Sequence, residues 1–389
     1  VDRVFHLIHS FRLLNFEWKN YYFGVLSDSY KTRKSMIIFQ KLYPIIQVFT
    51  LIFISLSVNQ AQIPVEPPEP RSRAEVESVL AKAPVVSDKN LRDLHIVLLA
   101  SEKDHGINEH DYPLWQKNWN LLLGGKKKDS DGTQINLFGP ENETPVDEMK
   151  AGAAKVKVST AWEWPSKKQF KSADLIVAFS VVKWSNERNS ELHKYLSRGG
   201  GFVTIHMSCV VGNALFDKTS GEISKASVED GGIDLDDEVA ELIGLSWNWD
   251  YTRWRHGPMN LDLVDKNHPI CLGLPRQIYF MDEAYWPLHG DRSKVTTIAS
   301  SKETIGNFKA SKSVEAIQQK WPTEPTKDEP MFWAYEYGKG RVYGCILGHY
   351  SWTFDDPYFR ILLLRGMAWA AGESVYRFDS LVLRGATIN

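Results

Sequence analysis

The feature that most constrains the fold is an alternation of short apolar runs with longer amphipathic segments, from about residue 92 onward. Short runs rich in Val, Ile and Leu predict buried strands, and apolar residues three or four positions apart predict helices. The predicted strands cover 95–100, 155–161, 173–180, 202–206, 252–264, 278–281, 295–299, 331–337 and 341–347. The predicted helices cover 112–123, 187–197, 235–243 and 359–371.

The order of these elements predicts the class of fold. Strands that alternate with helices form right-handed βαβ units, so the first half of the chain predicts a parallel sheet. Gly338-Lys339-Gly340 separates the last two strands and predicts a hairpin between them. We therefore predict an α/β fold with a doubly wound, mostly parallel sheet of the flavodoxin-like type, helices on both faces and an antiparallel edge hairpin.

An apolar stretch near the start of the chain has the layout of a signal peptide. Residues 42–58 are strongly apolar, follow the basic residues within 31–34 and precede the polar residues 59–62. A basic flank, an apolar stretch and a small-residue exit are the parts of a secretory signal. We therefore expect a signal peptide at 36–61, export to the periplasm or the extracellular space, and no stable membrane span after cleavage.

The remaining segments are distinguished by composition. Residues 1–35 precede the first methionine and are expected to be an upstream extension. Proline and glutamate are frequent in 62–91, which predicts an extended, solvated linker. The folded α/β domain is expected at 92–375, with a C-terminal tail at 376–389. Inside the domain, the polar segment 124–145 predicts a surface insertion.

Charge and glycine patterns exclude two classes of partner. The chain has 46 Lys and Arg against 48 Asp and Glu, and no basic cluster is interleaved with aromatic residues, so no nucleic-acid partner is predicted. No P-loop is present and no GxGxxG follows a strand, while Gly199, Gly200 and Gly201 precede a strand instead of a helix. A nucleotide cofactor is therefore not predicted.

Cysteine and aromatic content leave alternatives open. Cys209, Cys271 and Cys345 are the three cysteines, and their spacing excludes a disulfide framework and a zinc–thiolate site but allows one disulfide in an exported protein. Cys209 also lacks the small neighbours that a nucleophile elbow requires. The chain has 14 Trp, 15 Tyr and 18 Phe, which either fill a large core or line an aromatic pocket.

Titratable side chains follow four of the predicted strands. His105 comes after the first strand, His206 ends the fourth, Glu283 follows the strand at 278–281, and His349 follows the last. Ligands bind at the carboxyl ends of strands in an open α/β sheet, so we expect these groups to share one polar pocket. The alternatives are helix capping by the acidic loop, a core role for His206 and backbone-amide binding by the carboxylates.

Residue spacing suggests which of these groups meet. His105 and Glu109 are four residues apart and would share a face if a helix began there. In a 2-1-3-4 strand order the first and fourth strands are about 10 Å apart, so His105 and His206 could converge on one metal ion or substrate. Asp282 and Glu283 are adjacent carboxylates beside aromatic residues, where a raised pKa would suit acid–base work or metal binding.

A set of short motifs also runs in order through 92–375. The motifs are His105-Gly106 with Glu109-His110, Gly199-Gly200-Gly201-Phe202-Val203 with His206, His268-Pro269-Ile270 with Gly273, Asp282-Glu283-Ala284-Tyr285, Trp333-Ala334 with Gly338-Lys339-Gly340-Arg341-Val342 and Gly348-His349, and 365–372. Together they resemble the trehalose-utilisation (ThuA-like) family, whose domain has the class I glutamine-amidotransferase-like fold. The resemblance implies sugar metabolism, and some relatives look like metal binders.

The sequence departs from that family pattern in several places. Asn108 stands where many relatives have glycine, and Met207-Ser208-Cys209 replaces the usual small residues after the strand histidine. Residues 126–145 look like an insertion. The amidotransferase nucleophile and its triad are not reproduced, so glutamine amidotransferase activity is not expected.

The leading hypothesis is an exported enzyme that acts on a small-molecule carbohydrate, a sugar or an oxidised sugar derivative. Hydrolase, lyase or isomerase chemistry would be assisted by a divalent metal such as zinc. The expected metal ligands are His105, Glu109, His206 and His349. The expected catalytic residues are His206, Glu283 and Asp282, of which Asp282 would orient a histidine. The expected sugar-stacking residues are Trp164, Trp247, Trp249, Trp286 and Tyr285.

Two other functions compete with this hypothesis. One is a carbohydrate-binding or scaffolding module without turnover, in which the histidines are separated or occupied by hydrogen bonds. The other is a cysteine hydrolase on the same fold, with Cys209 as its nucleophile.

Overall fold

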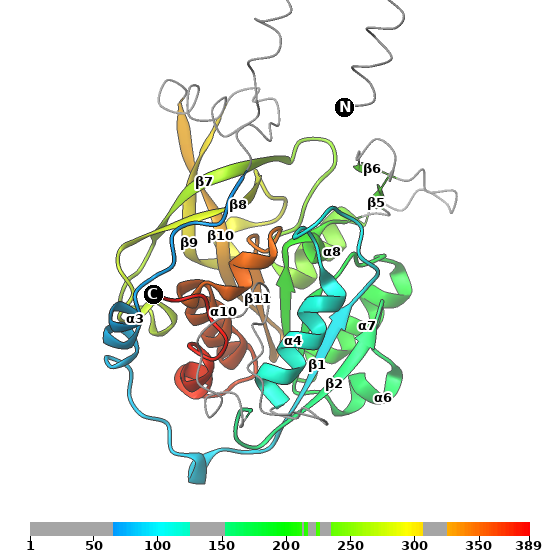
Figure 1. Ribbon diagram of the computed structural model, residues 1–389. Coiled ribbons are helices and arrows are strands. Elements are labelled where there is room, and N and C mark those ends of the chain that lie inside the picture. Colours follow the sequence, from blue (N-terminus) through cyan, green and yellow to red (C-terminus); the bar gives the residue numbers. More distant parts are fainter. Residues whose placement is uncertain (1–64, 125–151, 212–213, 217–222, 226–234, 306–324) are drawn as a thin grey trace, which may run out of the picture. The chain divides into compact units, whose positions relative to one another are not determined.

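The structure is a computed structural model that describes residues 65–124, 152–211, 214–216, 223–225, 235–305 and 325–389 (Figure 1). The chain divides into the units Val1–Gln62 and Ile63–Asn389, and every described residue belongs to the second. The expected extension, signal peptide and insertion at 126–145 lie outside the described residues. In the described ranges, no helix has the length and apolar character that a bilayer span requires.

Nine strands form one sheet in the order β2-β1-β3-β4-β11-β10-β9-β7-β8. The parallel part comprises β2 (Val156–Trp162), β1 (Leu94–Ala100), β3 (Leu175–Phe179), β4 (Gly201–Ile205) and β11 (Gly340–Cys345). The antiparallel part comprises β10 (Thr326–Tyr337), β9 (Val295–Thr304), β7 (Arg253–Leu263) and β8 (Gln277–Trp286). The α/β class and the predicted 2-1-3-4 order of the first strands are confirmed.

The expectation of a doubly wound, mostly parallel sheet is not confirmed. Four of the eight strand pairings in the sheet are parallel and four are antiparallel, so the sheet is mixed. The β10–β11 hairpin does form, but β11 pairs with β4 on its other side, so the hairpin lies inside the sheet and not at its edge. Strands joined by a tight turn must pair antiparallel, whereas parallel neighbours need a long crossover.

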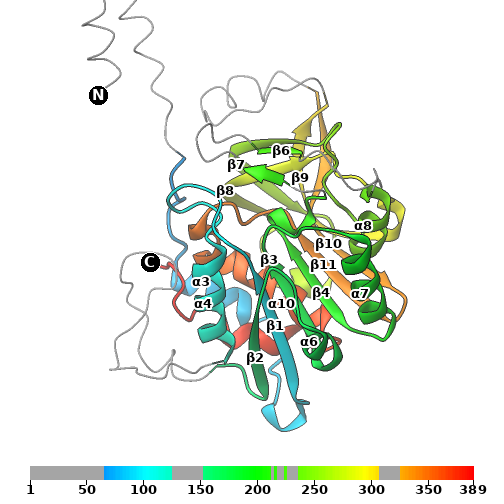
Figure 2. The ribbon, with the colours of Figure 1, turned by 90° about the vertical axis from the view of Figure 1, so that its right-hand side faces the viewer.

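Helices pack against the parallel strands from two sides. α4 (Tyr112–Gly124) contacts β1 and β2, and α10 (Pro357–Ala370) contacts β4 and β11. Figure 2 shows α4 on one side of the parallel strands and α6 (Lys167–Ser172), α7 (Asn186–Ser197) and α8 (Asp236–Ile243) on the other. With both faces covered, β1, β3 and β4 are buried along nearly their whole length, which explains their continuous apolar sequences.

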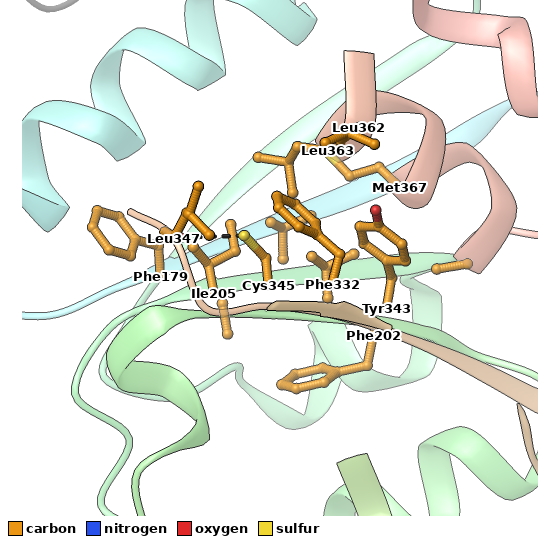
Figure 3. Close-up of a cluster of buried hydrophobic side chains, with 14 of the residues drawn as sticks. Phe179, Phe202, Ile205, Phe332, Tyr343, Cys345, Leu347, Leu362, Leu363 and Met367 are labelled. Atoms are coloured by element: carbon orange, nitrogen blue, oxygen red, sulfur yellow. Dashed lines mark hydrogen bonds between the residues drawn. The ribbon is translucent and has the colours of Figure 1, made fainter. Parts of the chain in front are cut away.

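The core between the sheet and α10 fixes the strands that lead to the site. In Figure 3, Leu362, Leu363 and Met367 of α10 lie over Phe332 and Tyr343 of β10 and β11. All five side chains are fully buried, and complete burial of such a side chain is worth about 1.5–3 kcal/mol. α10 begins where Asp356 caps the backbone amides of Tyr358 and Phe359, as expected for an aspartate ahead of proline.

Two terminal segments differ from their expected structure. Residues 62–91 are not an extended, solvated linker throughout, because they contain α3 (Arg73–Leu80), whose Val76 and Val79 are buried. The three-residue spacing of those valines supplies an apolar face that the proline content obscured. The expected tail at 376–389 is also packed, since η6 (Val375–Leu381) buries Phe378 and Leu381.

Candidate metal centre

Three histidines and one glutamate meet at the carboxyl ends of the parallel strands. The potential ligand atoms of His110, His206, Glu283 and His349 all lie within 4.8 Å of one another, and all four side chains are buried. We call these four residues the histidine cluster. They come from the loop after β1, the turn after β4, strand β8 and the loop after β11.

A backbone contact between two loops brings His110 to His349. The amide of His110 donates to the carbonyl of His349 at 2.9 Å, and that of Ser351 donates to Asn108 at 2.8 Å. Asn108 and His110 have φ values of 63° and 43°, in the left-handed region that non-glycine residues rarely adopt. The helix α4 begins at Tyr112, as predicted, so His105 and Glu109 do not share a helix face. The strained turn before α4 aims His110 at the cluster.

Strand β8 reaches the cluster although it lies at the far end of the sheet. Strand β7 pairs with β9 only at Asp262 and Leu263. The rest of the β7–β8 ribbon therefore extends away from β9. The predicted end of the strand at 281 is wrong, because pairing with β7 continues as far as Trp286. Glu283 is therefore a strand residue, directly opposite His256. Sequence reasoning missed His256, which the register of a 252–264/278–286 hairpin would have revealed.

Hydrogen bonds fix the tautomers of two cluster histidines. His206 Nδ1 donates to the carbonyl oxygen of Ile346 at 2.6 Å, and His110 Nδ1 donates to Asp104 Oδ1 at 3.0 Å. Burial opposes ionisation of Asp104, but hydrogen bonds from His105 and His110 hold the pKa of its carboxyl well below its usual range. Both partners therefore only accept, so we assign the lone pair to Nε2 in each imidazole.

The two Nε2 atoms face each other at 2.9 Å. Burial and the neighbouring His349 lower the pKa of His110 well below its usual value, so this ring is neutral. Two nitrogen lone pairs at that distance repel unless a cation lies between them. This arrangement is typical of metal-binding histidines, whose second ring nitrogen donates to a carboxylate or a backbone carbonyl.

Glu283 supplies the negative charge of the cluster. Its Oε2 lies 3.1 Å from His206 Nε2 and 2.9 Å from His349 Nδ1, and its Oε1 lies 3.3 Å from His256 Nε2. Burial would raise the pKa of Glu283, but the charges of His349 and His256 hold it well below its usual value. The carboxylate is therefore ionised and can act as a metal ligand.

His349 is the least satisfied member of the cluster. It is 1% exposed, and neither ring nitrogen has a hydrogen bond of good geometry within the described residues. Its Nε2 lies 3.6 Å from Glu109 Oε1. Burial would lower the pKa of His349, but the charges of Glu283 and Glu109 raise it to about 9. An imidazole with this pKa is protonated at neutral pH, so His349 must lose its proton before it can bind a cation.

Of the four predicted metal ligands, the structure places His206 and His349 in the cluster and the other two beside it. His105 donates to Asp104 Oδ1 at 2.8 Å, and its ring centroid lies 3.7 Å from that of His110. His105, Asp104 and His110 form an adjoining group of potential ligands. Glu109 contacts the cluster through His349. His110 and Glu283 take the places expected for His105 and Glu109.

Asp282 binds backbone amides instead of the cluster. Its Oδ1 accepts from the amides of Glu283 and His349, and its Oδ2 accepts from Gly348. Gly348 has a φ of 130°, which glycine alone adopts readily and which turns consecutive amides toward one carboxylate. Burial raises the pKa of Asp282. This residue therefore positions the backbone of His349.

Replacing Asp282 with asparagine is expected to lower the free energy of unfolding by about 2 kcal/mol, because the amide NH₂ faces a buried N–H donor. Urea unfolding of the metal-free protein measures the change. Asp262→Asn is the matched control, since the Asp262 carboxylate accepts from the exposed Gln277 side chain. Equal stability of the two variants would contradict the positioning role.

Three of the predicted aromatic residues adjoin the cluster. Tyr285 stacks on His206 with ring centroids 4.6 Å apart, and its hydroxyl oxygen lies 2.8 Å from His206 Nε2. Trp247 packs edge-on against Tyr285 at 4.8 Å, and Trp249 packs against Trp247 at 5.7 Å. These three residues form an aromatic wall beside the cluster.

The other two predicted aromatic residues have their contacts elsewhere. Trp164 packs against Trp184 and donates to Glu191. Trp286 is buried and donates to the carbonyl of Thr304. Successive strand residues point to opposite faces, so Trp286 faces away from Tyr285. Neither tryptophan is placed to stack on a ligand at the cluster.

The cysteines are unsuited to nucleophilic chemistry. Cys209, Cys271 and Cys345 are free and buried, and burial raises the pKa of Cys209 and of Cys271 to about 12. We expect iodoacetamide at neutral pH to leave all three unmodified in the native protein and to modify all three in urea, because the thiolate is the reactive form. Mass spectrometry measures the labelling. Rapid modification of native Cys209 would favour the cysteine-hydrolase alternative.

The fold and the cluster define an α/β protein with a candidate metal centre at the carboxyl ends of the parallel strands of a mixed sheet. The family model described as trehalose utilisation (ThuA) matches residues 144–370, more than half of the chain. The chain therefore belongs to the ThuA family. The match begins after the loop that carries His110, so this member of the cluster precedes the matched region.

Solved structures give more distant likenesses. A putative ThuA-like protein from Parabacteroides merdae is 17% identical with a TM-score of 0.44, over 72% of this chain and 91% of that one. A putative ThuA-like protein from Bacteroides uniformis is 14% identical with a TM-score of 0.45, over 72% of this chain and 92% of that one. No curated protein matches the chain. The family assignment rests on the sequence match.

Proposed function

We propose that this protein is a metal-dependent enzyme that acts on a sugar or an oxidised sugar derivative. One observation is the main support for metal dependence: the Nε2 lone pairs of His110 and His206 face each other at 2.9 Å in a buried site. Glu283 and His349 complete a set of three imidazoles and one carboxylate around the same point.

This ligand set fits a borderline divalent ion such as zinc, which takes imidazole nitrogen and carboxylate oxygen. When bound, such an ion polarises a carbonyl or lowers the pKa of a coordinated water. Asp104 and the carbonyl of Ile346 hold the rings of His110 and His206 in the metal-binding tautomer. Asp282 holds the backbone of His349.

The sugar is supported by the family and by the residues around the cluster. The matching family model is described as trehalose utilisation. Tyr285, Trp247 and Trp249 offer aromatic faces with polar edges, which suit the apolar faces of a pyranose ring. Glu109 is partly exposed and lies 3.6 Å from His349, so it would accept a proton from a sugar hydroxyl. The reaction would be a hydrolysis, elimination or isomerisation.

Export belongs to the same proposal. The signal-like segment at 36–61 would deliver the protein to the periplasm or the extracellular space. There the enzyme would meet sugars released outside the cytoplasm. Detection of the mature protein in an export fraction, with a new N-terminus near residue 62, would support this part of the proposal, and an intact N-terminus in the cytoplasm would contradict it.

Elemental analysis of full-length protein purified without a polyhistidine tag tests the metal. We expect about one divalent ion per chain, in keeping with a single four-ligand set. Turnover of trehalose and of its oxidised derivatives should then disappear on chelation and return with the same metal. Protein free of metal would reject the proposal. Protein that binds sugar without turning it over would establish the carbohydrate-binding alternative.

A further inference from the structure

Two hollows lie along α8, and their lining residues include none of the histidine cluster. The first has a volume of about 440 Å³ and is lined by Tyr251, His289 and Tyr335 together with acidic residues. The second has a volume of about 470 Å³ and is lined by His193, Tyr337 and Asn189. Both volumes fall in the range of small-molecule sites, roughly 300–1,000 Å³.

The hollows share a wall and a repeated pairing of side chains. Glu241 lines both of them. Tyr335 and Tyr337 are two residues apart on β10 with ring centroids at 6.4 Å, and one lines each hollow. Each hollow also holds a histidine bonded to a tyrosine hydroxyl. We call the two hollows together the α8 groove.

The first hollow contains three side chains joined by hydrogen bonds. His289 Nε2 lies 2.6 Å from Asp237 Oδ1, and His289 Nδ1 lies 2.5 Å from the Tyr251 hydroxyl. The Asp237 carboxylate only accepts, so Nε2 carries the proton and the Tyr251 hydroxyl donates to Nδ1. The oxygen of Tyr251 is therefore left to accept a hydrogen bond from a ligand.

The second hollow contains a buried acceptor that lacks a protein donor. Asn189 is 5% exposed, and its Nδ2 donates to Glu238 at 3.1 Å. Its Oδ1 is buried and has no hydrogen-bond partner among the described residues. This oxygen has no exposed surface that a ligand in the hollow could reach. Across the hollow, His193 Nδ1 bonds the Tyr337 hydroxyl at 2.7 Å.

The chemistry of the lining selects the kind of ligand. The groove is lined by the carboxylates of Asp237, Glu238, Glu241 and Asp291. The lining residues include one lysine, Lys294. This predominantly negative charge excludes phosphorylated and carboxylated ligands. Hydrogen-bond acceptors beside tyrosine rings suit a neutral molecule with many hydroxyl donors.

We propose that the α8 groove binds a neutral saccharide of at least two units, one in each hollow. The ligand donates hydroxyl hydrogen bonds to the oxygens of Tyr251 and Tyr337, and its rings lie along the tyrosines of β10. This second carbohydrate site is separate from the metal centre and does not depend on metal binding.

Calorimetric titration of the full-length protein with trehalose and with glucose tests the proposal. Trehalose should bind at least about tenfold more tightly than glucose, because only the disaccharide fills both hollows. Tyr251→Phe and Tyr337→Phe should each weaken trehalose binding about fivefold, the effect of one lost hydrogen bond. Tyr279→Phe is the control, since Tyr279 and Tyr251 are both 40% exposed. All three variants should keep the metal content of the wild type.

Several results would overturn the proposal. One is wild-type affinity for trehalose in both groove variants. A second is loss of trehalose binding in His349→Ala alone, which would place the sugar at the metal centre. A third is binding of spermidine in preference to trehalose, which would show that the acidic lining serves a cation. Metal content is measured separately, so failure of the groove leaves the test of the metal centre unaffected.

Discussion

Replacing His206 with asparagine is expected to reduce the bound metal to less than about a tenth of the wild-type amount. The substitution removes one of the two facing Nε2 atoms, and loss of even an outer-shell partner costs 10–100-fold in metal affinity. Asparagine suits the position, because His206 has a φ of 52° and asparagine tolerates the left-handed region. The backbone turn after β4 should therefore persist.

Elemental analysis after dialysis measures the result. His95→Asn is the matched control, because the His95 ring bonds the hydroxyls of Ser159 and Ser172 near the edge of the sheet. The control should retain the full metal content. If His206→Asn kept as much metal as His95→Asn, the ion would have to bind outside the cluster.

The second large effect is expected for Glu283→Gln in the metal-free protein. The carboxylate lies between His206, His256 and His349, and removing one partner from a buried ionic group typically costs about 3–5 kcal/mol. Urea unfolding after chelation should show a loss of this order. Glu336→Gln serves as the control, since Glu336 forms an exposed ion pair with Arg341, and it should change stability by less than about 1 kcal/mol.

The pH dependence of this difference follows from two pKa shifts. The pKa of Glu283 is lowered from 4.5, so its contribution is present above that pH and is lost on acidification. The pKa of His349 is raised from 6.5 to about 9, so its contribution is complete below 6.5 and is lost as the pH rises through about 9. The difference in the free energy of unfolding between wild type and Glu283→Gln should therefore be largest between pH 4.5 and pH 6.5. A difference that grew toward alkaline pH would contradict the ion-pair account.

Sequence reasoning predicted the part of the site that local rules determine. The βαβ pattern implied neighbouring parallel strands, and His206 and His349 follow two strands that pair with each other, β4 and β11. Residues at the carboxyl ends of adjacent parallel strands must lie close together. The strand order 2-1-3-4 followed from the same rules, and it placed the loop after β1 near them.

The rest of the cluster depends on geometry that those rules do not contain. His110 replaces His105 because left-handed residues at 108 and 110 redirect the loop, and periodicity carries no signal for such a turn. Glu283 and His256 arrive on a ribbon whose strands pair far from the parallel half of the sheet. The register of that ribbon is set by long-range pairing. Hydropathy therefore predicted its strands but not how far they extend toward the cluster.

Anomalous diffraction from crystals of the full-length protein tests the central claim most directly, with data collected at the absorption edge of the metal that elemental analysis identifies. The account predicts one peak bonded to Nε2 of both His110 and His206, at about 2.0–2.1 Å from each, with Glu283 and His349 completing the shell. The two Nε2 atoms should move apart to admit the ion. A peak outside the cluster, or an ion-free cluster with a proton shared between the two rings, would contradict it.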